Sequence, residues 1–140
     1  MADKMIFLNL PVEDLDRSKS FYEGLGWTIN PDFTDDNAAC VVVDDNICLM
    51  LLTKEFYGSF TKRPIGDSAN HSNAMYALSL DSREAVDELT EAAVKAGGTE
   101  EASPEGRRSQ EAEAGMHGRA FADPDGHQWE PFYMDYPAAA

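Results

Sequence analysis

The sequence predicts an α+β fold in which two tandem βαβββ modules form a cupped, mixed β-sheet around a cavity. Three observations support this class. An order of one strand, one helix and three strands occurs twice. The two expected helix starts, Asp14 and Asp81, are 67 residues apart, a spacing that no common solenoid repeat has. The chain has 140 residues, an ordinary length for one domain, so we expect residues 1–140 to form a single domain with two halves.

The first module is expected at about residues 5–53. Its first strand, MIFLNLPV, places Phe7 and Asn9 on one face and the leucines on the other. Asp14 is a good N-cap for the helix that follows, and Gly26 suits the left-handed position at its end. The helix has one inward face, formed by Leu15, Ser18, Tyr22 and Leu25. Three strands should then follow, at residues 27–33, 38–44 and 47–53.

The second module is expected at about residues 74–135. After a strand at AMYALSL, Asp81 is the expected N-cap of a helix, with Glu84 three residues later as in a capping box. Gly97 and Gly98 end that helix. A weak strand near GTEEAS, a strong one at GMHGRAFAD and a last one at HQWEPFYMD complete the repeat.

Two segments fall outside the repeat. The connector, about residues 54–73, is polar with an aromatic patch, and Thr53 could cap a short helix at its start. Residues 100–115 combine charges of both signs with Pro104 and Gly106, which predicts a mobile loop. Whether that loop closes over a pocket is left open by the sequence.

The composition excludes several classes of function. With 26 acidic and 11 basic residues the net charge is −15, so nucleic acid and anionic membrane are not expected partners. The acidity would help to attract a cationic ligand, although a soluble acidic surface is the simpler explanation of the charge. Neither a signal peptide nor a membrane-spanning apolar run is visible, so we expect a cytoplasmic protein. Cys40 and Cys48 fit no zinc spacing and should be reduced and buried.

The repeated modules, with VEDLDRSKSFYEGLGW opening the first and DPDGHQWE closing the second, resemble the vicinal oxygen chelate superfamily. This group includes glyoxalase I, extradiol dioxygenases, bleomycin-resistance proteins and fosfomycin-resistance enzymes. The resemblance extends from about Met5 to Asp135 and implies the cupped fold and, as often in this group, a homodimer. It does not by itself imply an activity, because function depends on the site rather than on the fold.

Metal-dependent members of the superfamily typically use two histidines and two glutamates, one from each of four inner strands. Carried over by position, these ligands fall on Phe7, Met50, Met75 and Glu130 of this chain. Only Glu130 can bind a divalent metal in the usual way, and a one-residue shift of any strand restores no histidine. We therefore expect neither the family metal nor another cofactor.

Glu130 allows three interpretations. It could be an inherited carboxylate that Gln128, Arg119 or a backbone donor satisfies. It could bind a cationic or hydrogen-bond-donating group of a ligand. It could also be an acid/base group, with a pKa raised by apolar neighbours such as Phe7, Met50 and Met75.

Of the three histidines, His71 and His127 are expected at the surface. His117 lies on a strand with Arg119 and Phe121 on the same face. It could be a satisfied core or rim histidine, or it could line the pocket and bind a ligand or transfer a proton.

Two functions follow from these residues. The first is a metal-independent small-molecule binding protein of the glyoxalase/bleomycin-resistance type. Phe7, Met50 and Met75 would form its apolar walls, and Asn9, His117 and Glu130 would make polar contacts. The alternative is a lyase or dioxygenase of the same superfamily, either metal-dependent or using Glu130 and His117 as acid and base. The methionines could also be ordinary core residues.

Overall fold

The computed structural model of the chain describes residues 4–135. The first module contains one main helix and four strands: β1 (Ile6–Val12), α1 (Leu15–Gly24), β2 (Thr28–Asn30), β3 (Ala38–Asp44) and β4 (Ile47–Thr53). A 3-10 turn, η1 (Pro31–Phe33), ends β2 earlier than expected because proline cannot continue the ladder. The connector begins with the short helix α2 (Lys54–Tyr57), whose Phe56 amide donates to Thr53 Oγ1 at 3.2 Å, as predicted.

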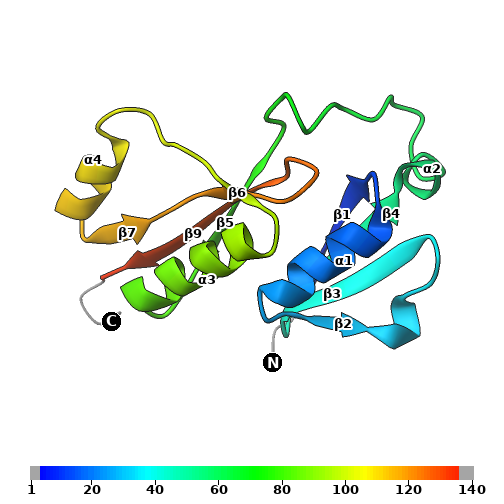
Figure 1. Cartoon of the computed structure of the whole chain (residues 1–140), viewed down its shortest axis with the longest axis horizontal. Helices are drawn as coiled ribbons and strands as arrows, with labels where there is room; N and C mark the ends of the chain where they lie inside the picture. Colours follow the sequence, from blue (N-terminus) through cyan, green and yellow to red (C-terminus); the bar gives the residue numbers. More distant parts are fainter. Residues whose placement is uncertain (1–3, 136–140) are drawn as a thin grey trace.

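The second module repeats this order with one addition. It contains β5 (Met75–Ser79), α3 (Arg83–Lys95), β6 (Thr99–Glu100), α4 (Arg107–Glu113), β7 (Met116–Gly118), β8 (Phe121–Ala122) and β9 (Gln128–Met134). Both β7 and β8 pair with β9, so together they take the place of the single strand expected at residues 115–123. Figure 1 shows the two modules side by side, with the connector passing above them from α2 to β5.

Both sheets have the same topology, which confirms the predicted α+β fold. In the first sheet the strand order is β1-β4-β3-β2, and in the second it is β5-β9-β8-β6. The opening strand of each module runs parallel to the closing strand, β1 with β4 and β5 with β9. Within residues 4–135 no ladder joins β1 to β5, so the modules form two mixed sheets rather than one continuous sheet.

The helix termini confirm some predictions and correct others. Asp14 caps α1, because its Oδ1 accepts from the Arg17 amide at 3.1 Å. The prediction of Asp81 as the cap of α3 is wrong by one residue: Ser82 Oγ accepts from the Ala85 amide at 3.0 Å.

Residues 100–115 are not simply a loop, because they contain α4. Glu111 explains this difference. It pairs with Arg107 at 2.9 Å and with Arg108 at 2.6 Å, one helical turn before it. Gly106, with φ of 82°, allows the chain to turn sharply into the helix.

The main core lies where the two modules meet through their helices. Tyr22 of α1 stacks on Trp27 and meets Trp129 of β9 edge-on. Phe21 packs against Phe121 of β8. Trp129 is 2% exposed, whereas its neighbours Gln128 and Glu130 are half-buried, which confirms the predicted alternation along β9. One face of each sheet therefore packs on the helices, and the opposite face is more open.

Two further features agree with the sequence. Cys40 and Cys48 are buried free thiols on the same face of the β3–β4 hairpin. No helix among the described residues combines the length and apolar character that a bilayer crossing requires.

Candidate functional site

The four positions of the family ligands lie on the open faces of the two sheets. Phe7 is 52% exposed and Met75 is 58% exposed. Met50 is half-buried and lies beside Asn9 across the β1–β4 ladder. Glu130 is half-buried and lies beside Ala77 across the β5–β9 ladder.

These residues do not fit the family metal. An aromatic ring and two thioethers replace three of its ligands, and hard or borderline divalent ions gain little from such groups. Within residues 4–135 no group of three or more His, Cys, Asp or Glu side chains lies close enough together to hold a metal ion.

Of the partners that the sequence suggested for Glu130, the structure excludes Arg119. Arg119 is engaged elsewhere, with Asp87 at 3.2 Å, Glu91 at 2.8 Å and Glu100 at 2.7 Å. This arginine lies on the helix side of the sheet, since both Asp87 and Glu91 belong to α3. Arg119 therefore cannot be the partner of Glu130, which faces the open side.

His117 also lies on the helix side. It is paired with Tyr133 in the β7–β9 ladder, and Tyr133 alternates with the open-face residues of β9. The Nε2 of His117 lies 2.9 Å from Asp87 Oδ1 on α3. The structure therefore does not bring His117 and Glu130 together, and the two side chains point to opposite faces of the sheet.

The two sheets instead enclose a different hollow, which we call the junction cleft. It has a volume of about 380 Å³ and lies between β1, β5, the start of β9 and the connector. Ten polar residues contribute to its lining: Asn9, Tyr57, Thr61, Arg63, Ser68, His71, Asn73, Tyr76, His127 and Gln128. Of the residues predicted from sequence, Asn9 alone lines this cleft.

Two tyrosines give the junction cleft an aromatic character. Tyr57 comes from α2 and Tyr76 from β5, and both are half-buried. Burial raises the pKa of the Tyr76 phenol, and the nearby charge of Asp123 raises it further. Tyr76 is therefore a neutral hydrogen-bonding group at physiological pH.

Gln128 lines the cleft and carries an acceptor without a partner. Its Oε1 is buried and has no hydrogen-bond partner in the described part of the chain. Gln128 also borders a neighbouring hollow of about 500 Å³, which shares Ser68, His71 and Gly126 with the junction cleft. A buried acceptor without a partner costs free energy in the folded protein.

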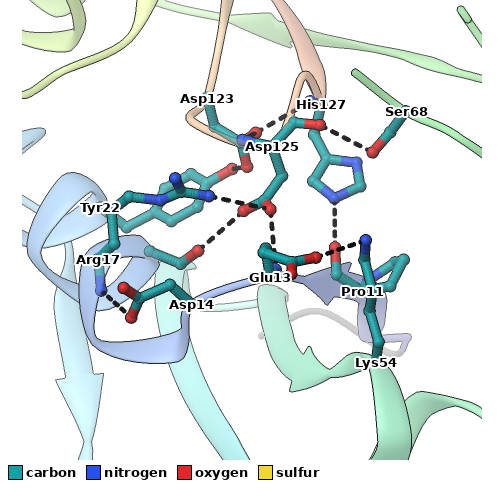
Figure 2. Close-up of polar contacts among 11 residues, drawn as sticks. Pro11, Glu13, Asp14, Arg17, Tyr22, Lys54, Ser68, Asp123, Asp125 and His127 are labelled. Atoms are coloured by element: carbon teal, nitrogen blue, oxygen red, sulfur yellow. Dashed lines mark hydrogen bonds and ion pairs between the residues drawn. The ribbon is translucent and has the colours of Figure 1, made fainter. Parts of the chain in front are cut away.

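The turn at Asp123–His127 joins the two modules through a polar network, which we call the intermodule clamp (Figure 2). Asp123 Oδ2 accepts from the Tyr22 hydroxyl at 2.6 Å, and its Oδ1 accepts from the amides of Asp125 and His127, both at 2.9 Å. The Tyr22 hydroxyl in turn accepts from Trp129 Nε1 at 3.1 Å. Burial raises the pKa of Asp123, although His127 and these hydrogen bonds favour the charged form.

Asp125 extends the clamp to the start of α1. Its Oδ1 accepts from the Glu13 amide at 2.8 Å and from Arg17 at 3.3 Å, and its Oδ2 accepts from Ser18 at 3.1 Å. Its backbone carbonyl accepts from Ser68 Oγ at 2.8 Å, which fixes the connector beside the turn.

The prediction that His127 is a surface residue is wrong. It is 8% exposed, and its Nε2 lies 2.8 Å from the Pro11 carbonyl oxygen on β1. His71 is exposed, as expected. The DPDGH segment thus has a structural role: it holds β1, α1 and the connector in place around the junction cleft.

Few patterns in the sequence indicated the cleft. The aromatic patch of the connector was visible, and it contributes Tyr57. The contributions of Arg63, Tyr76 and Gln128 depend on how the connector crosses the junction of the two sheets, which no local pattern encodes.

Comparison with known proteins agrees with this architecture. Residues 4–44 match a family model described as bleomycin resistance protein-like N-terminal. No curated protein matches the chain.

Several solved structures resemble the chain over nearly its whole length. A glyoxalase-related enzyme from Fulvimarina pelagi is 24% identical with a TM-score of 0.74, and the match covers 99% of this chain and 94% of that chain. The bleomycin resistance determinant encoded on transposon Tn5 is 23% identical with a TM-score of 0.57, with 95% and 99% covered. The fosfomycin resistance protein FosX from Listeria monocytogenes, complexed with Mn(II) and sulfate, is 16% identical with a TM-score of 0.66, with 96% and 93% covered. The chain therefore has the fold of the glyoxalase/bleomycin-resistance proteins.

Proposed function

We propose that this protein binds and sequesters a small molecule in the junction cleft, without the metal ion that many proteins of this fold use. The observation that carries the proposal is the cleft itself, of about 380 Å³, which is lined by polar and apolar side chains from both modules and from the connector. Pockets of this size are typical of small-molecule sites.

The substitution pattern at the family ligand positions supports metal independence. Phe7 and Met75 cannot replace histidine as ligands of a hard or borderline ion, and Glu130 alone does not define a coordination geometry. An enzyme that pairs Glu130 with His117 as acid and base is less well supported, because the two side chains lie on opposite faces of the sheet.

The test is direct binding in the presence of a chelator. Four probes would be titrated at up to about 1 mM: 1-naphthamide, 1-naphthoate, metal-free bleomycin and fosfomycin. We expect at least one to bind saturably at one site per chain, and we expect Ala74→Trp to abolish that binding by filling the cleft.

Ala69→Trp is the matched control, because Ala69 is exposed and lies outside the cleft lining. If no probe binds, or if binding requires an added divalent metal, the proposal is wrong. Turnover of a bound probe that is lost in Glu130→Gln would favour the enzymatic alternative.

We also propose that the protein forms a homodimer. β1 and β5 are edge strands in their sheets, and the start of β1 exposes three large apolar residues, Met5, Ile6 and Phe7, each more than half accessible. A second copy would remove these side chains and the open edges from water.

Light scattering coupled to size exclusion tests this proposal. We expect a dimer that dissociates in Phe7→Glu but persists in Phe33→Glu, because Phe33 is 66% exposed on η1, away from β1 and β5. A monomeric wild-type protein, or equal dissociation in both variants, would contradict it.

A further inference from the structure

The lining of the junction cleft differs in charge from the rest of the molecule. Acidic residues make up 26 of the 140 residues, so roughly three would be expected among the 17 residues that line the cleft. The lining contains none, and its one residue with a permanent charge is Arg63. The adjoining hollow, in contrast, includes Glu101 and Asp123.

Arg63 is available to a ligand. Four other arginines, Arg17, Arg107, Arg108 and Arg119, each pair with a carboxylate of the protein. Within residues 4–135 Arg63 forms no ion pair, and it is exposed at the edge of the cleft. A guanidinium presents several donors in one plane, which matches a carboxylate or sulfonate group.

The remaining walls suit a flat organic molecule. Tyr57 and Tyr76 contribute aromatic rings, and Pro64 and Ile65 contribute apolar surface. Gln128 adds a buried acceptor that needs a donor. The neutral phenol of Tyr76 and the amide of Asn9 can each hydrogen-bond to a donor or to an acceptor of a ligand, and neither group repels an anion.

We propose that the junction cleft binds a small aromatic monoanion, a carboxylate or sulfonate, with its charge at Arg63 and a hydroxyl or N–H donor at Gln128 Oε1. This inference rests on the proposed small-molecule function. It differs from the cationic ligand that the net charge of −15 favours, because that charge acts at long range and is screened by salt. The contacts inside the cleft decide which ligand is retained.

Three naphthalene probes of nearly equal size separate the effect of charge from that of shape. These are 1-naphthoate, neutral 1-naphthamide and cationic 1-naphthylmethylamine, titrated in 0.15 M salt by their fluorescence. We expect the anion to bind at least about tenfold more tightly than the cation.

Two matched variants test whether Arg63 binds the charged group of the ligand. Arg63→Gln should weaken naphthoate binding by about tenfold or more and leave naphthamide within about twofold. Lys62→Gln makes the same change in net charge at an exposed neighbour outside the lining, and it should leave both affinities within about twofold.

Gln128 is tested by adding a donor to the probe. Among hydroxy-substituted 1-naphthoates, at least one isomer should bind about tenfold more tightly than 1-naphthoate itself, and Gln128→Met should remove that advantage.

The outcomes distinguish this inference from the function on which it rests. Binding of the probes irrespective of their charge, or tighter binding of the cation, would overturn the anion site and leave the small-molecule function in place. Equal effects of Arg63→Gln and Lys62→Gln would also overturn it. Absence of binding by every probe would refute both.

Discussion

The hydroxyl of Tyr22 offers the sharpest test of the intermodule clamp. Tyr22→Phe removes a single oxygen from a side chain that is 0% exposed and leaves its ring contacts with Phe21 and Trp27 in place. Little apolar surface changes, so the effect reports on hydrogen bonding. Two groups lose a partner: the Asp123 carboxylate, at 2.6 Å, and the Trp129 indole N–H, at 3.1 Å.

The expected loss can be worked out from these two contacts. A buried hydrogen bond to a charged group contributes about 1.5–3 kcal/mol, and a buried donor left unpaired costs about 1–3 kcal/mol. We therefore expect Tyr22→Phe to lower the free energy of unfolding by about 3–5 kcal/mol. For a domain of this length the melting temperature should fall by roughly 10–15 °C.

The loss should also depend on pH. Burial raises the folded-state pKa of Asp123, and the Tyr22 hydroxyl opposes this by donating to the charged form. Removing the hydroxyl raises that pKa further. A folded-state pKa above the unfolded value reduces stability as pH rises through the interval between them, so the variant should lose more at about pH 8 than at about pH 4.5.

Urea unfolding followed by circular dichroism at the two pH values provides the measurement. Tyr133→Phe is the control, because Tyr133 is half-buried beneath Arg83 and outside the clamp. It should cost less than about 0.5 kcal/mol. A loss below about 1 kcal/mol in Tyr22→Phe, or a loss that shrinks as pH rises, would refute the reasoning.

Two further predictions concern the connector and α4. Gly126→Ala should destabilise the protein by about 3 kcal/mol or more and expose the connector to trypsin, because φ is +90° and a Cβ would overlap the Ser68 carbonyl. As a control, Gly66→Ala should have little effect on urea unfolding. Equal effects of the two substitutions would contradict this account. Burial acts to raise the pKa of Glu111, but Arg108 and Arg107 lower this pKa below its ordinary value. Glu111→Gln should therefore cost roughly 1–3 kcal/mol in urea unfolding at about pH 7, and the difference from wild type should vanish as pH falls through the depressed pKa, where wild type loses the same stability. A difference that stays constant down to about pH 2 would rule out this ion-pair explanation.

Local patterns predicted most of the fold. The alternation around Trp129 gave the correct faces of the last strand, and Asp14 and Gly26 gave the correct limits of the first helix. These signals work because capping and strand periodicity depend on a few neighbouring residues. The helix at residues 107–113 was missed because its charges of both signs indicated a loop, whereas in three dimensions Glu111 pairs with two arginines one turn away.

The candidate site was predicted less well. Residue positions carried over from the family led to the open faces, where Phe7, Met50, Met75 and Glu130 lie. The parity of His117 with Phe121 was read correctly, but parity alone does not say which face meets the helices. The junction cleft arises where segments from both modules meet, so it could be found only once the path of the connector was known.

The clamp has a consequence for how the chain folds. Several of its bonds join residues more than 100 positions apart, such as Tyr22 with Asp123 and Pro11 with His127, at 101 and 116 positions. The hairpin turn of the first module, at residues 45–46, carries no counterpart of these contacts among the described residues, so the duplicated halves are alike in topology but not interchangeable. The buried side chains that bond across this clamp, such as Tyr22 and Ser18, reach these partners only when both halves have formed. We therefore expect this chain, although it is built from two similar modules, to unfold in one cooperative transition. We also expect the formation of these long-range bonds to be a late and slow step of folding.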